Sequence, residues 1–113
     1  MTEPRLKTEL WVQAQVRLCD LGLMPIAVRR RGDPDAGAVL LRLLRDGDRS
    51  LLLQRVTTGG GISAWMVAGG KAEVEDPSAE AYIARAVSQD PDLWIVEIED
   101  PKRRYQTDGP VQT

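Results

Sequence analysis

The segment from residue 38 to residue 45 constrains the fold of this chain most strongly, because it is apolar on both of its faces. In an extended conformation its large side chains divide into two sets: Val39, Leu41 and Leu43 on one side, Leu40 and Leu44 on the other. A strand of this kind is typical of the centre of a sheet that is covered on both sides. The 113-residue chain has no phenylalanine, so the core around this strand has to be mainly aliphatic.

Periodicity and turn residues predict the other elements. A helix is expected from Thr8, as its N-cap, to Gly22, and its core-facing side chains recur at helical spacing: Leu10, Trp11, Ala14, Leu18 and Leu21. Asp76, as N-cap, and Pro77 open a second helix that ends before Pro91. Further strands are expected at residues 26–31, 51–56, 64–68 and 93–99.

The order helix-strand-strand-strand-strand-helix-strand predicts an α+β domain. We expect a mainly antiparallel sheet of about four to five strands with two packed helices. The first four strands are expected to pair as hairpins, and the last one to enter the sheet by a crossover. Residues 1–106 are expected to form a single domain, and residues 107–113 a disordered tail, because the end of the chain is polar and aperiodic.

Missing residue types restrict the chemistry. The sequence has no histidine and a single cysteine, Cys19. This excludes a Ser-His-Asp triad, a Cys-His pair and a histidine-based zinc site within one chain. A lone cysteine cannot form an internal disulfide, so we expect a cytoplasmic protein. Because Cys19 lies among apolar helical positions, we expect its thiol to be buried in the core. The residue pattern indicates no cofactor and no metal ion, and it favours a protein without catalytic activity.

The net charge of −2 is unevenly divided. Residues 1–56 hold ten Lys and Arg against seven Asp and Glu, whereas residues 57–113 hold five against ten. Nucleic-acid binding usually needs a net basic footprint, so we do not expect it as a main role. No apolar stretch approaches the roughly 20 residues that span a bilayer, and no membrane role is expected.

Three consecutive arginines form the first candidate binding site. Arg29, Arg30 and Arg31 lead into the turn from Asp33 to Gly37. Strand alternation places Arg29 and Arg31 on the same side, with Arg30 on the other. A phosphate or a carboxylate could be bound there by the exposed loop amides and by four residues: Arg29, Arg31, Asp33 and Gly37. The alternative is that the arginines only keep an edge strand from aggregating.

A second candidate is an interface at Trp65 and Met66. The three tryptophans are expected to supply the large side chains of the core, but Trp65 follows a glycine loop and adjoins a methionine. That pairing is equally consistent with a contact surface. The glycine runs at residues 59–61 and 69–70 lack the spacing of a phosphate-binding loop, and we interpret them as hairpin connections.

Carboxylates gather at residues 73–80 and 90–100. Paired carboxylates can bind Mg²⁺ or Mn²⁺ or act as acid and base, which leaves a metal-dependent hydrolase as a weaker alternative. Most of these side chains are already explained as a helix cap, as turn residues or as the polar side of a strand.

Three blocks carry a resemblance to a known family: Pro4-Arg5-Leu6, the stretch from Arg31-Gly32-Asp33 through Ala36-Gly37-Ala38-Val39-Leu40-Leu41, and residues 90–99 preceded by Tyr82-Ile83-Ala84-Arg85. Together they resemble the small alphaproteobacterial domain-of-unknown-function family 1491 over about residues 4–105. The resemblance implies a bacterial, intracellular domain. It supplies no activity, substrate or site residue to transfer.

From these observations we expect a small non-enzymatic cytoplasmic binding or accessory module that acts through protein–protein contact, with a protein partner or with a second copy. The first alternative is a binder of a small anionic ligand or a nucleotide phosphate at the segment from Arg29 to Gly37. The second is the carboxylate metal-dependent hydrolase.

Overall fold

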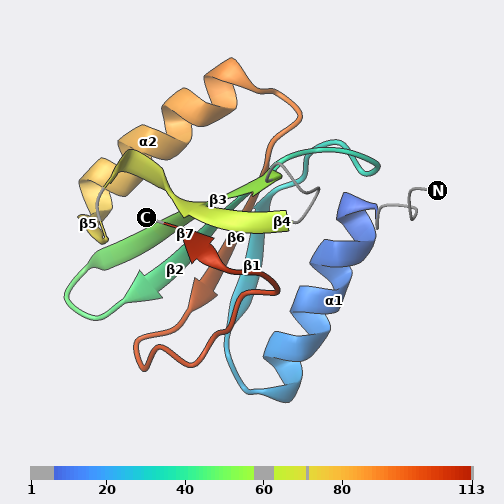
Figure 1. Ribbon diagram of the computed structural model, residues 1–113. Helices are drawn as coiled ribbons and strands as arrows, with labels where there is room; N and C mark the ends of the chain where they lie inside the picture. Colours follow the sequence, from blue (N-terminus) through green and yellow to red (C-terminus); the bar gives the residue numbers. More distant parts are fainter. Residues whose placement is uncertain (1–6, 58–62, 71, 113) are drawn as a thin grey trace.

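The structure is a computed structural model that describes residues 7–57, 63–70 and 72–112. Two helices pack on opposite faces of one sheet (Figure 1). The elements in chain order are α1 (Thr8–Leu21), β1 (Ile26–Arg30), β2 (Val39–Arg45), β3 (Arg49–Thr57), β4 (Ser63–Val67), a 3₁₀ turn (Ala68–Gly70), β5 (Val74–Glu75), α2 (Asp76–Gln89), β6 (Trp94–Glu99) and β7 (Val111–Gln112). Within the described residues, neither helix is long and apolar enough to cross a membrane.

The sheet has seven strands in the order β1-β6-β2-β3-β4-β7, with β5 paired to β3. The α+β class is confirmed, but the sheet is mixed rather than mainly antiparallel and has more strands than expected. The pairs β2–β6 and β4–β7 are parallel, and the remaining pairs are antiparallel. The crossover through α2 inserts β6 between β1 and β2, so these two strands do not form the expected hairpin.

β2 is the central strand that its two apolar faces predict. On the α1 face, its side chains pack with Trp11, Cys19, Leu53, Trp65, Trp94 and Val96. On the α2 face, they pack with Leu52, Ala79, Ile83, Leu93 and Ile95. Two separate apolar layers therefore hold the helices on the sheet, and burial of these side chains is the main stabilising contribution.

The buried face of α1 differs from the one that apolar spacing predicts. Its core-facing residues are Thr8, Trp11, Val12, Gln15 and Cys19. Leu10, Leu18 and Leu21 are exposed instead. Two polar side chains are tolerated inside because each has a hydrogen-bond partner. The Thr8 hydroxyl donates to the Gly37 carbonyl at 2.8 Å, and the Gln15 amide oxygen accepts from the Tyr105 hydroxyl at 2.7 Å.

The prediction that Thr8 and Asp76 are N-caps is wrong. Lys7 and Glu75 occupy the N-cap positions, and neither makes a side-chain cap hydrogen bond. Thr8 and Asp76 are the first helical residues. Thr8 ties α1 to the Gly37 carbonyl, and the Asp76 carboxylate accepts a hydrogen bond from Arg42 at 3.0 Å. Both polar side chains therefore fasten the start of a helix to another part of the fold.

The end of the chain, for which the sequence predicts a disordered tail from residue 107, makes contacts with the sheet and with α1. Residues 111 and 112 pair with β4. The Asp108 carboxylate accepts the indole N–H of Trp11 at 2.7 Å and that of Trp65 at 2.9 Å. Two buried indoles need an acceptor, and the polar tail supplies it.

Candidate functional site

The helix α1 lies beside β1, the edge strand of the sheet (Figure 1), and a groove lies between these two elements. Its volume is about 220 Å³, and its lining residues are Glu9, Val12, Gln13, Val16, Val28, Arg31 and Trp94. Val16 and Val28 form apolar walls over a floor of the buried Val12 and Trp94, and Glu9, Gln13 and Arg31 supply polar groups. The groove therefore combines apolar walls with a charged rim.

Arg31 and Trp94 define one end of this groove. The guanidinium carbon of Arg31 lies 5.4 Å from the centroid of the Trp94 ring. The ring is held in place because its N–H donates to the Asp33 carbonyl at 2.8 Å. Arg31 also pairs with Glu9 at 2.8 Å, with the two side chains 70% and 37% exposed. An ion pair this exposed contributes about 0–1 kcal/mol, so Arg31 can exchange Glu9 for another carboxylate.

The strand beside the groove has an open edge. β1 is the terminal strand of the sheet, and no described strand pairs with its outer side. The amide of Glu99 donates to the Pro25 carbonyl at 2.9 Å, and Ile26 lies opposite Ile98. In an antiparallel pair, hydrogen-bonded and non-hydrogen-bonded positions alternate. The N–H and C=O groups of Ile26 and Val28 therefore point outward.

A β-bulge follows Val28 and separates the arginines. The pairing register changes between Val28 and Arg30, so the expectation that Arg29 and Arg31 share a side is wrong. Arg29 pairs with Glu80 and Glu97, at 2.9 and 2.8 Å, and its hydrogen bonds with these carboxylates raise its pKa. Arg31 turns to the α1 face. The structure thus does not bring Arg29 and Arg31 together.

The turn from Asp33 to Gly37 uses its amides internally. The Ala36 amide donates to the Asp33 carboxylate at 2.8 Å, and the Gly37 amide donates to the Asp33 carbonyl at 3.2 Å. The turn also packs closely on the backbone of Asp92: a Cβ on Gly32 would lie 2.0 Å from the Asp92 carbonyl oxygen, and one on Gly37 2.6 Å from it. Asp33 and Gly37 therefore have a structural role.

The two residues of the predicted interface, Trp65 and Met66, differ in exposure and do not form one surface. Trp65 is fully buried beside Trp11, with ring centroids 5.5 Å apart, so it is not the surface residue that the interface hypothesis requires. Met66 alone is exposed. Of the two glycine runs, residues 69 and 70 follow β4 in the 3₁₀ turn, and residues 59–61 lie outside the described residues.

Sequence reasoning missed a buried arginine on β2. The Arg42 guanidinium donates to the Ser50 hydroxyl at 2.9 Å, to Glu97 at 2.8 Å and to Asp76 at 3.0 Å. It also reaches Glu80. This cluster joins α2 to three strands. The available signal was the position of Arg42, a charged residue inside an otherwise apolar strand.

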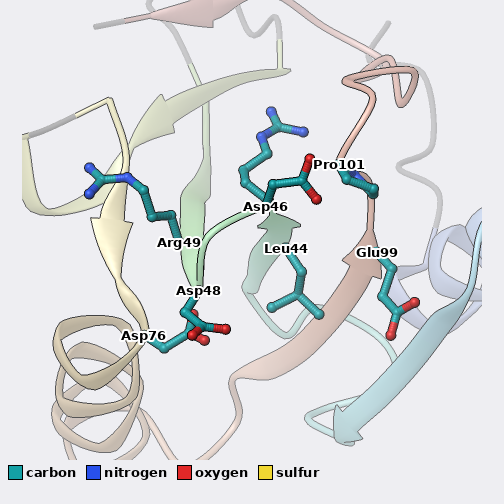
Figure 2. A pocket seen from close by; sticks show the side chains of 8 residues that line it. Leu44, Asp46, Asp48, Arg49, Asp76, Glu99 and Pro101 are labelled. Carbon is teal, nitrogen blue, oxygen red and sulfur yellow. The ribbon is translucent and has the colours of Figure 1, made fainter.

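A second cavity, of about 300 Å³, lies at the C-terminal end of β2 (Figure 2). Its lining residues are Leu44, Arg45, Asp46, Asp48, Arg49, Asp76, Glu99 and Pro101. Asp48 lies next to Asp76, whereas Asp46 and Glu99 point elsewhere. Asp76 is engaged by Arg42 and Ser50. In the described part of the chain, no three Asp, Glu or Cys side chains are grouped so that they could hold a metal ion.

Comparisons with known proteins place this architecture in a family. The model of a family described as "Protein of unknown function (DUF1491)" matches residues 6–108. A crystal structure of a DUF1491 family protein from Caulobacter crescentus CB15 is 38% identical, with a TM-score of 0.85, and the alignment covers 96% of this chain and 100% of that one. An NMR structure of a DUF1491 family protein from the same organism is 36% identical, covers 98% and 100%, and has a TM-score of 0.83.

A solution structure of a protein from A. tumefaciens is 27% identical, with a TM-score of 0.71, and the alignment covers 85% of this chain and 86% of that one. The comparison with curated proteins finds no match.

Proposed function

The chain belongs to the DUF1491 family, whose description assigns no function, and from this premise we propose that it is a non-enzymatic binding module. Its partner is an extended segment of another protein, which adds as a strand along the open edge of β1. We further propose that it acts in the cytoplasm, because its one cysteine cannot form an internal disulfide.

The observation that carries the proposal is the open edge of β1 directly beside the groove. Outward N–H and C=O groups at Ile26 and Val28 offer main-chain hydrogen bonds to an added strand. An adjacent groove takes alternate side chains of that strand. Strand addition generally obtains affinity from the backbone and specificity from such side-chain grooves.

The groove also indicates the chemistry of the partner. Its apolar walls, formed by Val16 and Val28, suit one apolar side chain. At its rim, Arg31 has only an exposed ion pair with Glu9, so a carboxylate of the partner can replace Glu9. We therefore propose a segment with an apolar residue followed by Asp or Glu. The bulge after Val28 limits regular pairing to a short stretch.

The two alternatives have less support. A small-anion site at Arg29, Arg31, Asp33 and Gly37 would need groups that point to one place, but Arg29 and Arg31 lie on different faces and the turn amides are already bonded. A carboxylate hydrolase would need several converging carboxylates. Around the second cavity only Asp48 and Asp76 lie next to each other (Figure 2), and Asp76 is already engaged by Arg42 and Ser50.

A peptide titration tests the proposal. A fluorescein-labelled peptide of alternating threonine and leucine followed by two aspartates is compared, by fluorescence polarisation, with the same peptide ending in two lysines. We expect the acidic peptide to bind more tightly. Arg31→Gln should weaken its binding by about tenfold, the effect of losing one charge-assisted hydrogen bond. Arg85→Gln, a change at an exposed position of α2, is the matched control and should have no effect.

Equal affinity for the two peptides, or equal effects of Arg31→Gln and Arg85→Gln, would show that the groove does not select a carboxylate. Absence of binding to either peptide would favour the simpler explanation that the arginines only protect an edge strand.

A further inference from the structure

We propose that α1 carries a second surface, distinct from the groove, that binds a second copy of this chain. We call it the leucine face, and it consists of Leu10, Ala14, Leu18, Leu21 and the following Leu23. Its leucines are 49%, 58%, 73% and 86% exposed in chain order. Positions 10, 14, 18 and 21 share one side of a helix with 3.6 residues per turn. The groove uses another side, through Val12 and Val16.

Exposed leucines are unremarkable when they are scattered singly. Here three of the seven large exposed apolar side chains of the described chain, Leu10, Leu18 and Leu21, share one side of α1, and a fourth, Leu23, follows the end of the helix. Exposure also rises along it, so that Leu18, Leu21 and Leu23 form its most accessible part. A contiguous apolar surface on a charged protein is typical of an interaction site.

The charges beside the leucine face indicate that the occupant is a second copy. Arg17 and Asp20 are both exposed, and among the described residues neither takes part in an ion pair. They are three residues apart on one flank of the face. When two α1 helices pack antiparallel about a two-fold axis, each Arg17 meets the Asp20 of the other copy. The same surface then serves both partners, as an isologous interface requires.

The apolar side chains fit the same arrangement. The register that joins Arg17 to Asp20 places Leu18 of one copy against Leu21 of the other. It also brings Ala14, whose side chain is small, near Leu23 of the other copy. Charge and apolar complementarity therefore agree on one antiparallel register, which does not use the side of α1 that faces the groove and β1.

Sedimentation velocity of the full chain over a range of protein concentrations tests this surface. We expect a reversible monomer–dimer equilibrium. Leu21→Glu should weaken dimerisation at least tenfold, whereas Met66→Glu, a matched change at another exposed site, should leave it unchanged. Circular dichroism verifies that each variant is folded. Arg17→Asp should weaken the dimer, and Arg17→Asp combined with Asp20→Arg should restore it.

A monomer at every concentration would overturn the proposal. So would a dimer that neither Leu21→Glu nor the charge reversal affects, because it would use another surface. The test is separate from the proposed function, since Leu21→Glu should leave peptide binding at β1 intact and Arg31→Gln should leave dimerisation intact.

Discussion

The guanidinium of Arg31 lies over the indole of Trp94, 5.4 Å from the ring centroid. This contact assigns Arg31 to the groove between α1 and β1 rather than to an anion site at the strand end. A cation–π contact at an exposed position contributes about 0.5–1 kcal/mol, which is enough to hold the guanidinium over the ring while leaving its outer N–H groups free to change partners.

Removing the carboxylate that now neutralises Arg31 should strengthen binding of an acidic peptide. The Arg31–Glu9 pair is exposed, and such a pair contributes up to about 1 kcal/mol. Glu9→Gln should therefore lower the Kd for the acidic peptide by roughly two- to fivefold. Fluorescence polarisation measures the effect. An unchanged Kd would mean that the peptide carboxylate does not replace Glu9 at Arg31.

The Asp108 carboxylate should be important for stability, because it is the acceptor for the indoles of Trp11 and Trp65. Asp108→Ala leaves two donors without a partner and should lower the free energy of unfolding by about 1–3 kcal/mol. Asp35→Ala, at an exposed ion pair with Lys7, is the control and should change it little. Urea denaturation checks both variants, and equal small effects would contradict the packed tail.

Stability should fall in acid through carboxylates such as Asp100. Burial alone would raise the pKa of Asp100, but hydrogen bonds from the amides of Tyr105 and Arg104 and from Arg45 outweigh it, so its pKa lies below the ordinary value. A depressed pKa contributes stability that is complete above the unfolded-state pKa, about 3.9, and is lost as pH falls through the folded-state value.

We therefore expect the Tm to be nearly constant from pH 7 to about pH 5 and to decrease below it. Asp100→Asn should make that decrease shallower. Differential scanning calorimetry between pH 7 and pH 3 measures both curves. An equally steep decrease in the variant would mean that Asp100 does not contribute to the acid sensitivity.

Arg42 should tolerate truncation poorly. Its guanidinium is buried among Asp76, Glu80 and Glu97, and removing one partner of a buried ion pair leaves uncompensated charge. Arg42→Ala should cost about 3–5 kcal/mol of unfolding free energy. Arg85→Ala, at an exposed position of α2, should cost much less. Comparable losses in urea denaturation would show that the network is not stabilising.

Several features of the fold could be predicted because local signals determine them. The two apolar faces of β2 identify the central strand. Pro77 lies in the first turn of α2 and Pro91 follows shortly after its last residue, so these prolines mark the two ends of the helix. Strand pairing depends on long-range packing instead, so the insertion of β6 between β1 and β2 turned an expected antiparallel sheet into a mixed one. The contacts of the tail could not be predicted, because they depend on two distant indoles that need Asp108 as an acceptor.

The candidate site was predictable only in part. Arg31 was identified from its charge at a strand end, but its neighbours Val12, Val16 and Trp94 come from other elements. The bulge after Val28 has no signal in the sequence, and it alone sends Arg29 and Arg31 to different faces. On α1, Thr8 and Gln15 took core positions because distant hydrogen-bond partners satisfy them, which left the leucines outside.

Amide hydrogen exchange of β1, followed by NMR as the acidic peptide is added, tests the central claim most directly. The outward amides of Ile26 and Val28 should exchange more slowly in the complex, because an added strand bonds to them. The amide of Ala27, which points toward β6, serves as the internal reference and should change little. Peptide binding that leaves the exchange rates of Ile26 and Val28 unaltered would contradict strand addition at this edge.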